Sequence, residues 1–129
     1  MKKIEVVAAV IRSEGKTLCV QRGQGKYEYV SEKWEFPGGK VEANETQNQA
    51  LLREIKEELL IDISVDSFLI TVEHKYPDFE LVMHCYLCST DSKELTLTEH
   101  IDHKWLDDHQ LSILDWAEAD IPVVEKLIQ

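Results

Sequence analysis

Three glutamates are spaced so that a single helix would bring their carboxylates together. Glu54, Glu57 and Glu58 stand at i, i+3 and i+4 within residues 45–60, a stretch of mostly strong helix formers without Gly or Pro. Like charges at this spacing repel each other, and in the C-terminal half of a helix they also oppose its dipole. A bound hard cation such as Mg²⁺, which prefers carboxylate oxygens, would offset both costs. The alternative is a solvated acidic face, the usual arrangement of glutamates on a surface helix.

The residues around this acidic group predict how the helix is positioned. A short apolar strand, Trp34 to Phe36, is followed by the break Pro37-Gly38-Gly39. Asn44 is predicted to cap the helix, with Gln47 three residues later completing a capping box. One side of the helix is apolar and should pack it onto the rest of the protein. This side comprises Leu51, Leu52, Ile55 and Leu59.

The order of these residues resembles the Nudix box, the signature of the Nudix hydrolases. The matching positions are Gly39, Glu45, the run Arg53-Glu54-Ile55-Lys56-Glu57-Glu58, and Ile61. The chain departs from the box at Leu60, where the family has a glycine. Because a glycine near a helix end commonly adopts a left-handed conformation, Leu60 predicts either a different helix exit or strain of about 1–2 kcal/mol.

The resemblance extends beyond the box, to the MutT-like and CTP pyrophosphohydrolase-like branch. It is carried by the start MKKIEVVAAVIR, by WEFPGGK, by the YPD turn, by a late tryptophan and by the ending ADIPVVEKL. It implies an α+β fold, an α/β/α sandwich with a mixed β-sheet between helices. We expect a single domain over residues 1–129.

The apolar patterns along the chain are consistent with such a fold. The predicted strands are 4–11 and 17–22, paired antiparallel, then 62–72 and 79–88 as a hairpin, with weaker signals at 95–99 and 100–106. A short helix is predicted at 108–114, and a final helix begins near Ala119 with proline in its first turn. Trp105 should be a core residue, and Gly23 to Lys33 should form a mobile loop near the site.

The resemblance also implies a reaction, the hydrolysis of a nucleoside diphosphate linked to another group. For the MutT-like branch that group is phosphate, so a nucleoside triphosphate and water give the monophosphate and pyrophosphate. The implied cofactor is Mg²⁺, with Mn²⁺ as a possible substitute, held by Glu54, Glu57, Glu58 and the Gly39 carbonyl. Arg53 would pair with Glu45 and orient the carboxylates.

The attacking water needs a general base, and two glutamates are candidates. Glu54 is the simplest choice within the box. Glu99, in the loop before Trp105, matches the position of a further functional carboxylate in MutT-like enzymes, which makes it a candidate base or metal ligand. His100 and His103 flank Glu99 and are alternatives, although lone loop histidines are usually surface residues.

Four residues could contact the nucleotide from the strands and the hairpin. Arg22, at the end of the second strand, could bind phosphate or base, as an arginine does in MutT-like enzymes; the alternative is a surface cation. Phe36 could be a core residue, flank a base, or both. Tyr76 or Phe79 could stack on a base, although hairpin aromatics are more often packing residues.

A fifth residue, Asp120, matches the position where MutT has an asparagine that reads oxidised guanine. An ionised aspartate only accepts hydrogen bonds. It suits the exocyclic amine of cytosine, or the N1–H and N2–H edge of guanine, but not guanine O6. We therefore favour CTP, dCTP or a 5-substituted cytosine nucleotide over 8-oxo-dGTP. The alternative role is a helix N-cap, because Pro122 follows two residues later.

Composition limits the partners and the location. The 129 residues carry a formal net charge of −11, which disfavours DNA and RNA polymers and requires a cation between the protein and a polyphosphate. No apolar run is long enough to cross a bilayer, and the N-terminus reads as a strand rather than a signal peptide. We expect no membrane partner, a cytoplasmic location, and a monomer or homodimer. Cys19, Cys85 and Cys88 should be buried reduced thiols, since Cys85 and Cys88 would lie on opposite faces of one strand.

Two other functions compete with catalysis. A Nudix-like domain that binds a nucleotide without cleaving it would be expected to lose glutamates of the box, and all of them are present here. An acidic protein-interaction module would leave the spacing of the box unexplained. We therefore predict an enzyme.

Overall fold

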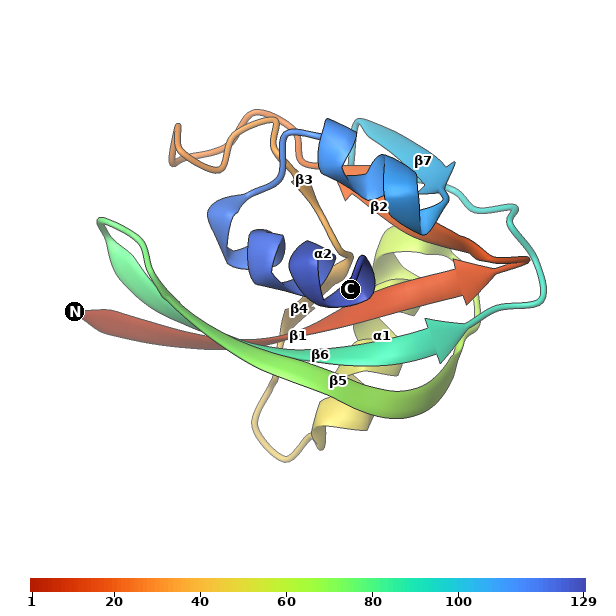
Figure 1. Cartoon of the computed structure of the whole chain (residues 1–129). Coiled ribbons are helices and arrows are strands. Elements are labelled where there is room, and N and C mark those ends of the chain that lie inside the picture. Colours follow the sequence, from red (N-terminus) through yellow and green to blue (C-terminus); the bar gives the residue numbers. More distant parts are fainter.

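The apolar, β-branched segment near the N-terminus forms the central strand of the protein. In the computed structural model, which describes residues 1–129, β1 (Lys2–Ser13) pairs antiparallel with β2 (Lys16–Gln21) and parallel with β6 (Phe79–Ser89). The order in the sheet is β3-β2-β1-β6-β5, with β3 at Trp34–Glu35 and β5 at Ser64–Lys75 (Figure 1). Two further strands attach to it: β4 (Gly38–Lys40) pairs with β1, and β7 (Asp102–Leu106) pairs with β2.

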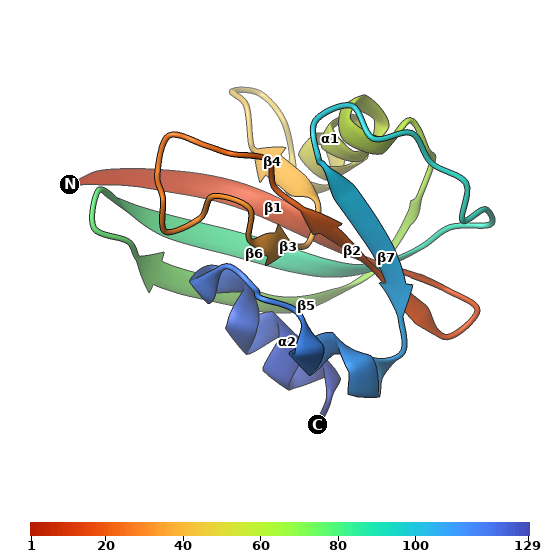
Figure 2. The ribbon, with the colours of Figure 1, turned by 90° about the horizontal axis from the view of Figure 1, so that it is seen from above.

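Helices cover both faces of this sheet. Figure 2 shows α1 (Gln47–Leu59) on one side and α2 (Ile121–Leu127) on the other. Because side chains alternate along β1, they divide between two cores. Val7, Ala9 and Ile11 pack under α1, whereas Ala8 and Val10 pack in the core that α2 covers. The α+β arrangement expected from the sequence, a mixed sheet between helices, is confirmed.

The three cysteines are free and buried, as predicted. Cys85 lies in the core on the α2 side and Cys88 in the core on the α1 side, so the C-x-x-C spacing does not bring them together. Burial raises the pKa of each of the three thiols, including Cys19, to about 12. These thiols are therefore neutral, inert core groups.

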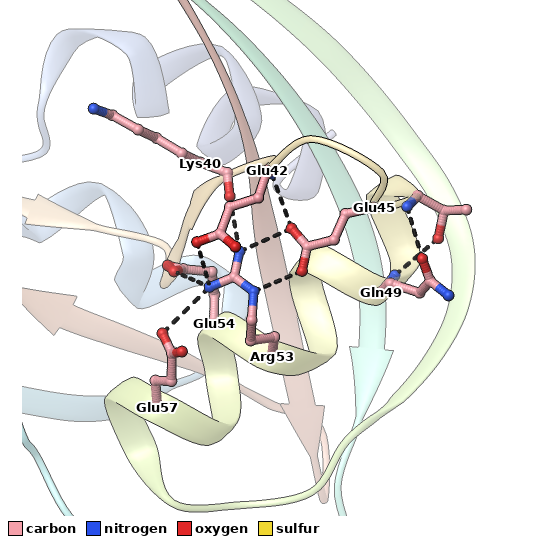
Figure 3. Close-up of polar contacts among 8 residues, drawn as sticks. Lys40, Glu42, Glu45, Gln49, Arg53, Glu54 and Glu57 are labelled. Atoms are coloured by element: carbon pink, nitrogen blue, oxygen red, sulfur yellow. Dashed lines mark hydrogen bonds and ion pairs between the residues drawn. The ribbon is translucent and has the colours of Figure 1, made fainter.

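The start of α1 differs from the prediction. Its N-cap is Thr46, whose hydroxyl accepts the Gln49 N–H, while the Gln49 side chain accepts the Thr46 N–H (Figure 3). The assignment of Asn44 as the cap was wrong, because Asn44 has a φ of 68° and belongs to the turn before the helix, a conformation that asparagine tolerates. Leu52 is 45% exposed rather than part of the packed face. The buried residues of α1 are Ala50, Leu51, Ile55, Glu58 and Leu59.

The later elements follow the predicted order, with two corrections. β5 and β6 form the expected hairpin. Residues 95–99 form no strand; instead the N–H groups of Thr96 and Thr98 donate to the carbonyls of Leu59 and Glu58 at the end of α1. The helix expected at 108–114 is a 3₁₀ helix, Asp108–Ile113. Trp105, on β7, is partly buried against the core on the α1 side.

The C-terminal helix has proline in its first turn, as predicted, but its N-terminus is built differently. A 3₁₀ turn, Glu118–Asp120, precedes α2, and the Asp120 side chain makes no capping hydrogen bond. A capping role for this side chain was therefore wrong. Val123 and Val124 are buried, whereas Ile128 is 47% exposed. Neither α-helix has the length and apolar character of a membrane span.

Leu60 shows the second of the two outcomes expected from its departure from the box. It ends α1 in the left-handed conformation, with φ 56° and ψ 37°, and its N–H donates to the Lys56 carbonyl. A side chain with a Cβ costs about 1–2 kcal/mol in this conformation. The Leu60 side chain is 53% exposed, so burial offsets only part of that cost.

Replacing Leu60 by glycine should therefore stabilise the protein. We expect Leu60→Gly to raise the free energy of unfolding by about 0.5–1 kcal/mol, the relief of strain less the larger unfolded-state entropy of glycine. Leu52→Gly is the matched control, since Leu52 is similarly exposed but inside α1; it should lower the same quantity by about 1 kcal/mol. Urea unfolding measures both, and a loss of stability in Leu60→Gly would contradict the assigned strain.

Candidate active site

Arg53 connects the loop before α1 to the acidic residues of the helix. Its Nε and Nη2 lie 2.6 and 2.9 Å from the two Glu45 oxygens, and Nη2 also donates to the Lys40 carbonyl at 3.1 Å. Nη1 lies 2.8 Å from Glu54 and 3.3 Å from Glu57 (Figure 3). The predicted Arg53–Glu45 pair is present and bidentate. The Arg53 hydrogen bonds, followed by the Glu42 N–H, lower the pKa of Glu45 to about 2.

Glu58 differs from the other two glutamates of the predicted acidic face. Glu54 and Glu57 reach Arg53, whereas Glu58 is buried, with 3% of its surface exposed. Burial, followed by the negative charges of Glu54, Glu35 and Glu99, raises its pKa to about 9. All three carboxylates were expected on the helix surface, and no pattern in the sequence indicated that one of them would be buried.

Gly38 and Gly39 allow β4 to pass very close to β1 and α1. A Cβ on Gly38 would lie 1.9 Å from the Val7 carbonyl oxygen, and a Cβ on Gly39 would lie 1.8 Å from Oε2 of Glu54. The Gly39 backbone is therefore next to the Glu54 carboxylate, as the resemblance implied. No group of three or more aspartate, glutamate, histidine or cysteine side chains is arranged in this structure so that it could hold a metal ion.

The loop before β7 contributes two side chains near Glu58. Glu99 is exposed, as a loop glutamate should be, and its charge acts on Glu58. The His100 side chain is only 5% exposed, so its assignment to the surface was wrong. Its Nε2 lies 2.9 Å from Oε2 of Glu35 and 3.9 Å from Oε1 of Glu58, and its Nδ1 is buried without a partner. His103 pairs on β7 with Val20 and does not join this group.

Glu35 is the residue that sequence reasoning missed. Alternation along β3 was the available signal, because Trp34 and Phe36 are buried in the core and Glu35 between them must face the other way. Its carboxylate contacts His100 through one oxygen and Nη1 of Arg22, at 3.2 Å, through the other.

A polar cavity of about 300 Å³ lies between these groups and the loop after β2. It has no apolar residue in its lining. The lining residues are Arg22, Gly23, Gln24, Gly25, Glu35, Gly38, Glu58, Glu99 and His100.

A second cavity, of about 380 Å³, is mainly apolar, and twelve of its eighteen lining residues are hydrophobic. All five residues predicted to contact a nucleotide line it: Arg22, Phe36, Tyr76, Phe79 and Asp120. Phe36 and Tyr76 are also buried core residues, so both of their proposed roles are compatible with the structure. Arg22, Glu35 and Gly38 line both cavities, which therefore adjoin.

Asp120 is the buried acidic residue of the apolar cavity, whose other acidic residue, Glu35, also lines the polar cavity. It is 4% exposed, and its Oδ1 accepts the Phe36 N–H at 3.0 Å. Burial, followed by the charge of Glu35, raises the pKa of this carboxyl well above its usual value. The sequence argument assumed an ionised aspartate. A protonated carboxyl keeps an acceptor and gains a donor, so it resembles asparagine more closely.

Comparison with known proteins agrees with this geometry. The model of the NUDIX domain family matches residues 1–127. The chain is 36% identical to the CTP pyrophosphohydrolase of Escherichia coli K12 over 125 residues, 97% of this chain and 91% of the relative. It is 39% identical to the 8-oxo-dGTP diphosphatase of Proteus vulgaris over 95 residues, 74% of this chain and 84% of the relative.

The fold also matches solved structures. The crystal structure of a MutT protein from Methanosarcina mazei superposes with a TM-score of 0.87, at 23% identity, covering 98% of this chain and 93% of that one. With the family match over almost the whole sequence, the conclusion is that this chain belongs to the Nudix family and is a hydrolase of phosphoanhydrides, a nucleotide pyrophosphohydrolase.

Proposed function

We propose that this chain is a Mg²⁺-dependent nucleoside triphosphate pyrophosphohydrolase that acts on CTP, dCTP or a 5-substituted cytosine nucleotide. It converts the triphosphate and water to the monophosphate and pyrophosphate. The observation that carries the proposal is the pair of adjoining cavities, one apolar with a single buried carboxyl and one polar and acidic, which meet at Arg22 and Glu35. This arrangement suits a base at one end and phosphates at the other.

The apolar cavity is the proposed site of the base. A nucleobase in this cavity would stack on aromatic side chains and be buried among aliphatic ones, and Asp120 would orient the base by a hydrogen bond. When ionised, Asp120 accepts from the cytosine amine through the oxygen that does not bind the Phe36 N–H. Arg22, beside Glu35 at the junction of the cavities, is placed to contact the phosphate nearest the sugar.

The acidic side fits a divalent cation. Glu54, Glu57, Glu58, Glu99 and the Gly39 carbonyl are the groups proposed to hold Mg²⁺, or Mn²⁺ in its place. The fit rests on two observations: a buried Glu58 surrounded by further carboxylates, and a Gly39 backbone that leaves no room for a side chain beside Glu54. When bound there, the cation would neutralise phosphate charge next to an otherwise repellent surface.

The protein side chains would position the water and take its proton. Phosphoryl transfer depends mainly on positioning and charge neutralisation, and we assign attack at the β-phosphorus. Glu54 is the proposed base, since Arg53 holds one of its oxygens at 2.8 Å and so fixes the orientation of the carboxylate. Arg53 is itself held by Glu45. Glu99, in the polar cavity, is the alternative base or a further ligand of the cation.

A second candidate substrate is 8-oxo-dGTP. Two observations favour it: relatives at 31–39% identity have this activity in their names, and the raised pKa of Asp120 allows the neutral, asparagine-like form. A neutral carboxyl could donate to guanine O6, which an ionised one cannot. The base preference is therefore tied to the protonation of Asp120.

The reaction is tested by incubating the purified protein with Mg²⁺ and a panel of nucleoside triphosphates while pyrophosphate release is measured. We expect cytosine nucleotides to be hydrolysed, and Glu57→Gln to lower kcat by several orders of magnitude, because it removes a charged ligand. Glu125→Gln is the matched control, because Glu125 is an exposed residue on α2, and this variant should retain full activity. Full activity in Glu57→Gln would show that the metal assignment is wrong.

The cation site is tested without turnover by Gly39→Ala. The new Cβ would displace the flexible Glu54 side chain rather than backbone, so the fold should persist. We expect Mg²⁺ affinity, measured by calorimetry without nucleotide, to fall by about 10-fold or more, the usual effect of misplacing a metal-site group. A Cβ at Gly25, also beside the polar cavity, meets nothing within 4 Å, so Gly25→Ala should bind Mg²⁺ normally. Equal affinities in both variants would remove Glu54 and Gly39 from the site.

The role of Asp120 predicts a pH-dependent preference. Because its pKa is raised, the neutral form persists to higher pH than in an ordinary aspartate, and the ionised form dominates only above the raised pKa. The ratio of kcat/KM for CTP over 8-oxo-dGTP should therefore increase with pH in the wild type. In Asp120→Asn, which cannot ionise, the ratio should favour guanine and stay constant with pH. An identical ranking in the two proteins at every pH would reject Asp120 as the base reader.

A further inference from the structure

The loop after β2 and the β5–β6 turn meet through aromatic rings. The Tyr27 and Tyr29 rings stack with centroids 5.4 Å apart, and Tyr29 stacks on Tyr76 at 5.3 Å. Phe79 completes the group, at 5.5 Å from Tyr27 and 5.2 Å from Tyr76. We call these four residues the aromatic cluster. It joins two segments that are distant in sequence but adjacent at the rim of the apolar cavity.

One polar contact reinforces this junction. The Tyr29 hydroxyl donates to Oδ2 of Asp78 at 2.8 Å, across the same gap between loop and turn. Most other hydrogen bonds of the loop are internal, such as Gly25 N–H to the Ser31 hydroxyl and Glu32 N–H to the Gly23 carbonyl. The loop is therefore a compact unit, and its attachment to the hairpin depends on the aromatic cluster and on the Tyr29–Asp78 bond.

Tyr27 is the aromatic side chain that this loop contributes to the apolar cavity. It lines the cavity together with Phe36, Tyr76 and Phe79, whereas Tyr29 does not line it. Tyr29 stacks almost parallel to Tyr27, with an angle of 16° between the ring planes. The Tyr29 ring thus covers one face of the Tyr27 ring, and its bond to Asp78 holds it there.

We propose that Tyr27 contacts the nucleobase and is a specificity-determining wall of the cavity, and that Tyr29 and Asp78 are positioning residues that hold it in place. The proposal rests on the base-binding role of the apolar cavity proposed above. It does not require hydrolysis or a bound cation, because none of the four residues of the aromatic cluster lines the polar cavity.

A purely structural role for Tyr27 would have different consequences. A packing residue contributes to stability but not to base binding, whereas a ring that stacks on a base contributes about 1–3 kcal/mol to binding. That energy corresponds to about a 5- to 150-fold change in dissociation constant. The two roles are separated by measuring binding and thermal stability in the same variants.

The experiment is NMR titration of the full chain with CMP and with GMP, in EDTA so that no cation takes part. We expect intermolecular NOEs between the Tyr27 ring protons and base protons of a bound nucleotide. Tyr27→Leu should weaken binding by about 10- to 100-fold, and Tyr27→Phe should retain it, because the ring rather than the hydroxyl makes the contact. Phe68→Leu is the matched control, because it replaces an exposed aromatic side chain on β5 that does not line the apolar cavity.

The positioning residues are tested by a double-mutant cycle. Tyr29→Phe and Asp78→Ala should each weaken nucleotide binding several-fold, and the double variant should be no worse than either, because each change removes the same hydrogen bond. Tyr86→Phe is the control, since the Tyr86 hydroxyl bonds to Gln47, far from the cluster. Additive losses in the double variant would overturn the positioning role.

The remaining outcomes are also decisive. Binding with no NOE to Tyr27 and with Tyr27→Leu within twofold of the wild type would overturn the proposal, as would failure of both CMP and GMP to bind. Equal losses of stability and affinity in Tyr27→Leu and Phe68→Leu would reduce Tyr27 to a packing role. If the nucleotide binds through Tyr27 but no triphosphate is hydrolysed, the proposed reaction is rejected and the proposed contact between Tyr27 and the nucleobase is retained.

Discussion

The close approach of several negatively charged side chains to Glu58 is the constraint on which the rest of the site depends. Glu58 is enclosed beside Glu54, Glu35 and Glu99, and its pKa rises to about 9 because the ionised form loses water and gains repulsion. Arg53 does not relieve this, since its three nitrogens are engaged with Glu45, Glu54, Glu57 and the Lys40 carbonyl. Burial and repulsion therefore favour the protonated form of Glu58, whereas a cation held by its carboxylate would favour the ionised form.

The fold produces this crowding through β1. Its alternating side chains hold a helix-covered core on each face, so β1 is fixed from both sides. β4 pairs with it through glycines that no larger residue could replace without moving Val7 or Glu54. The acidic face of α1 is therefore held against the strand, and the loop before β7 closes over it by bonding to the last carbonyls of the helix. The acidic side of the site is therefore attached to β4, β1 and the end of α1.

Sequence reasoning predicted the parts of the site that depend on local spacing. The opposite faces of Cys85 and Cys88 follow from positions within one strand, and strain at Leu60 was one of the two outcomes expected at the helix end. The Arg53–Glu45 pair was expected from the resemblance to the Nudix box. The errors concern contacts between elements. Asparagine is in isolation a better N-cap than threonine, so Asn44 was the natural choice, and only the path of the loop makes Thr46 the cap. His100 is enclosed because Glu35 and Glu58, from two other elements, converge on it, and no local pattern could have shown this.

Glu35 links the two halves of the site electrostatically. Its charge raises the pKa of Asp120 in the apolar cavity and of Glu58 on the acidic side, while Arg22 acts on Asp120 in the opposite direction. A phosphate that drew Arg22 away from Glu35 would let the negative charge of Glu35 act more strongly on the carboxyls of Asp120 and Glu58. A cation near Glu58 would have the opposite effect. Since such effects are reciprocal, the protonation of Asp120 depends on what occupies the polar cavity. In the proposed mechanism the choice of base and the binding of the cation are therefore coupled, although the groups proposed to perform them line separate cavities.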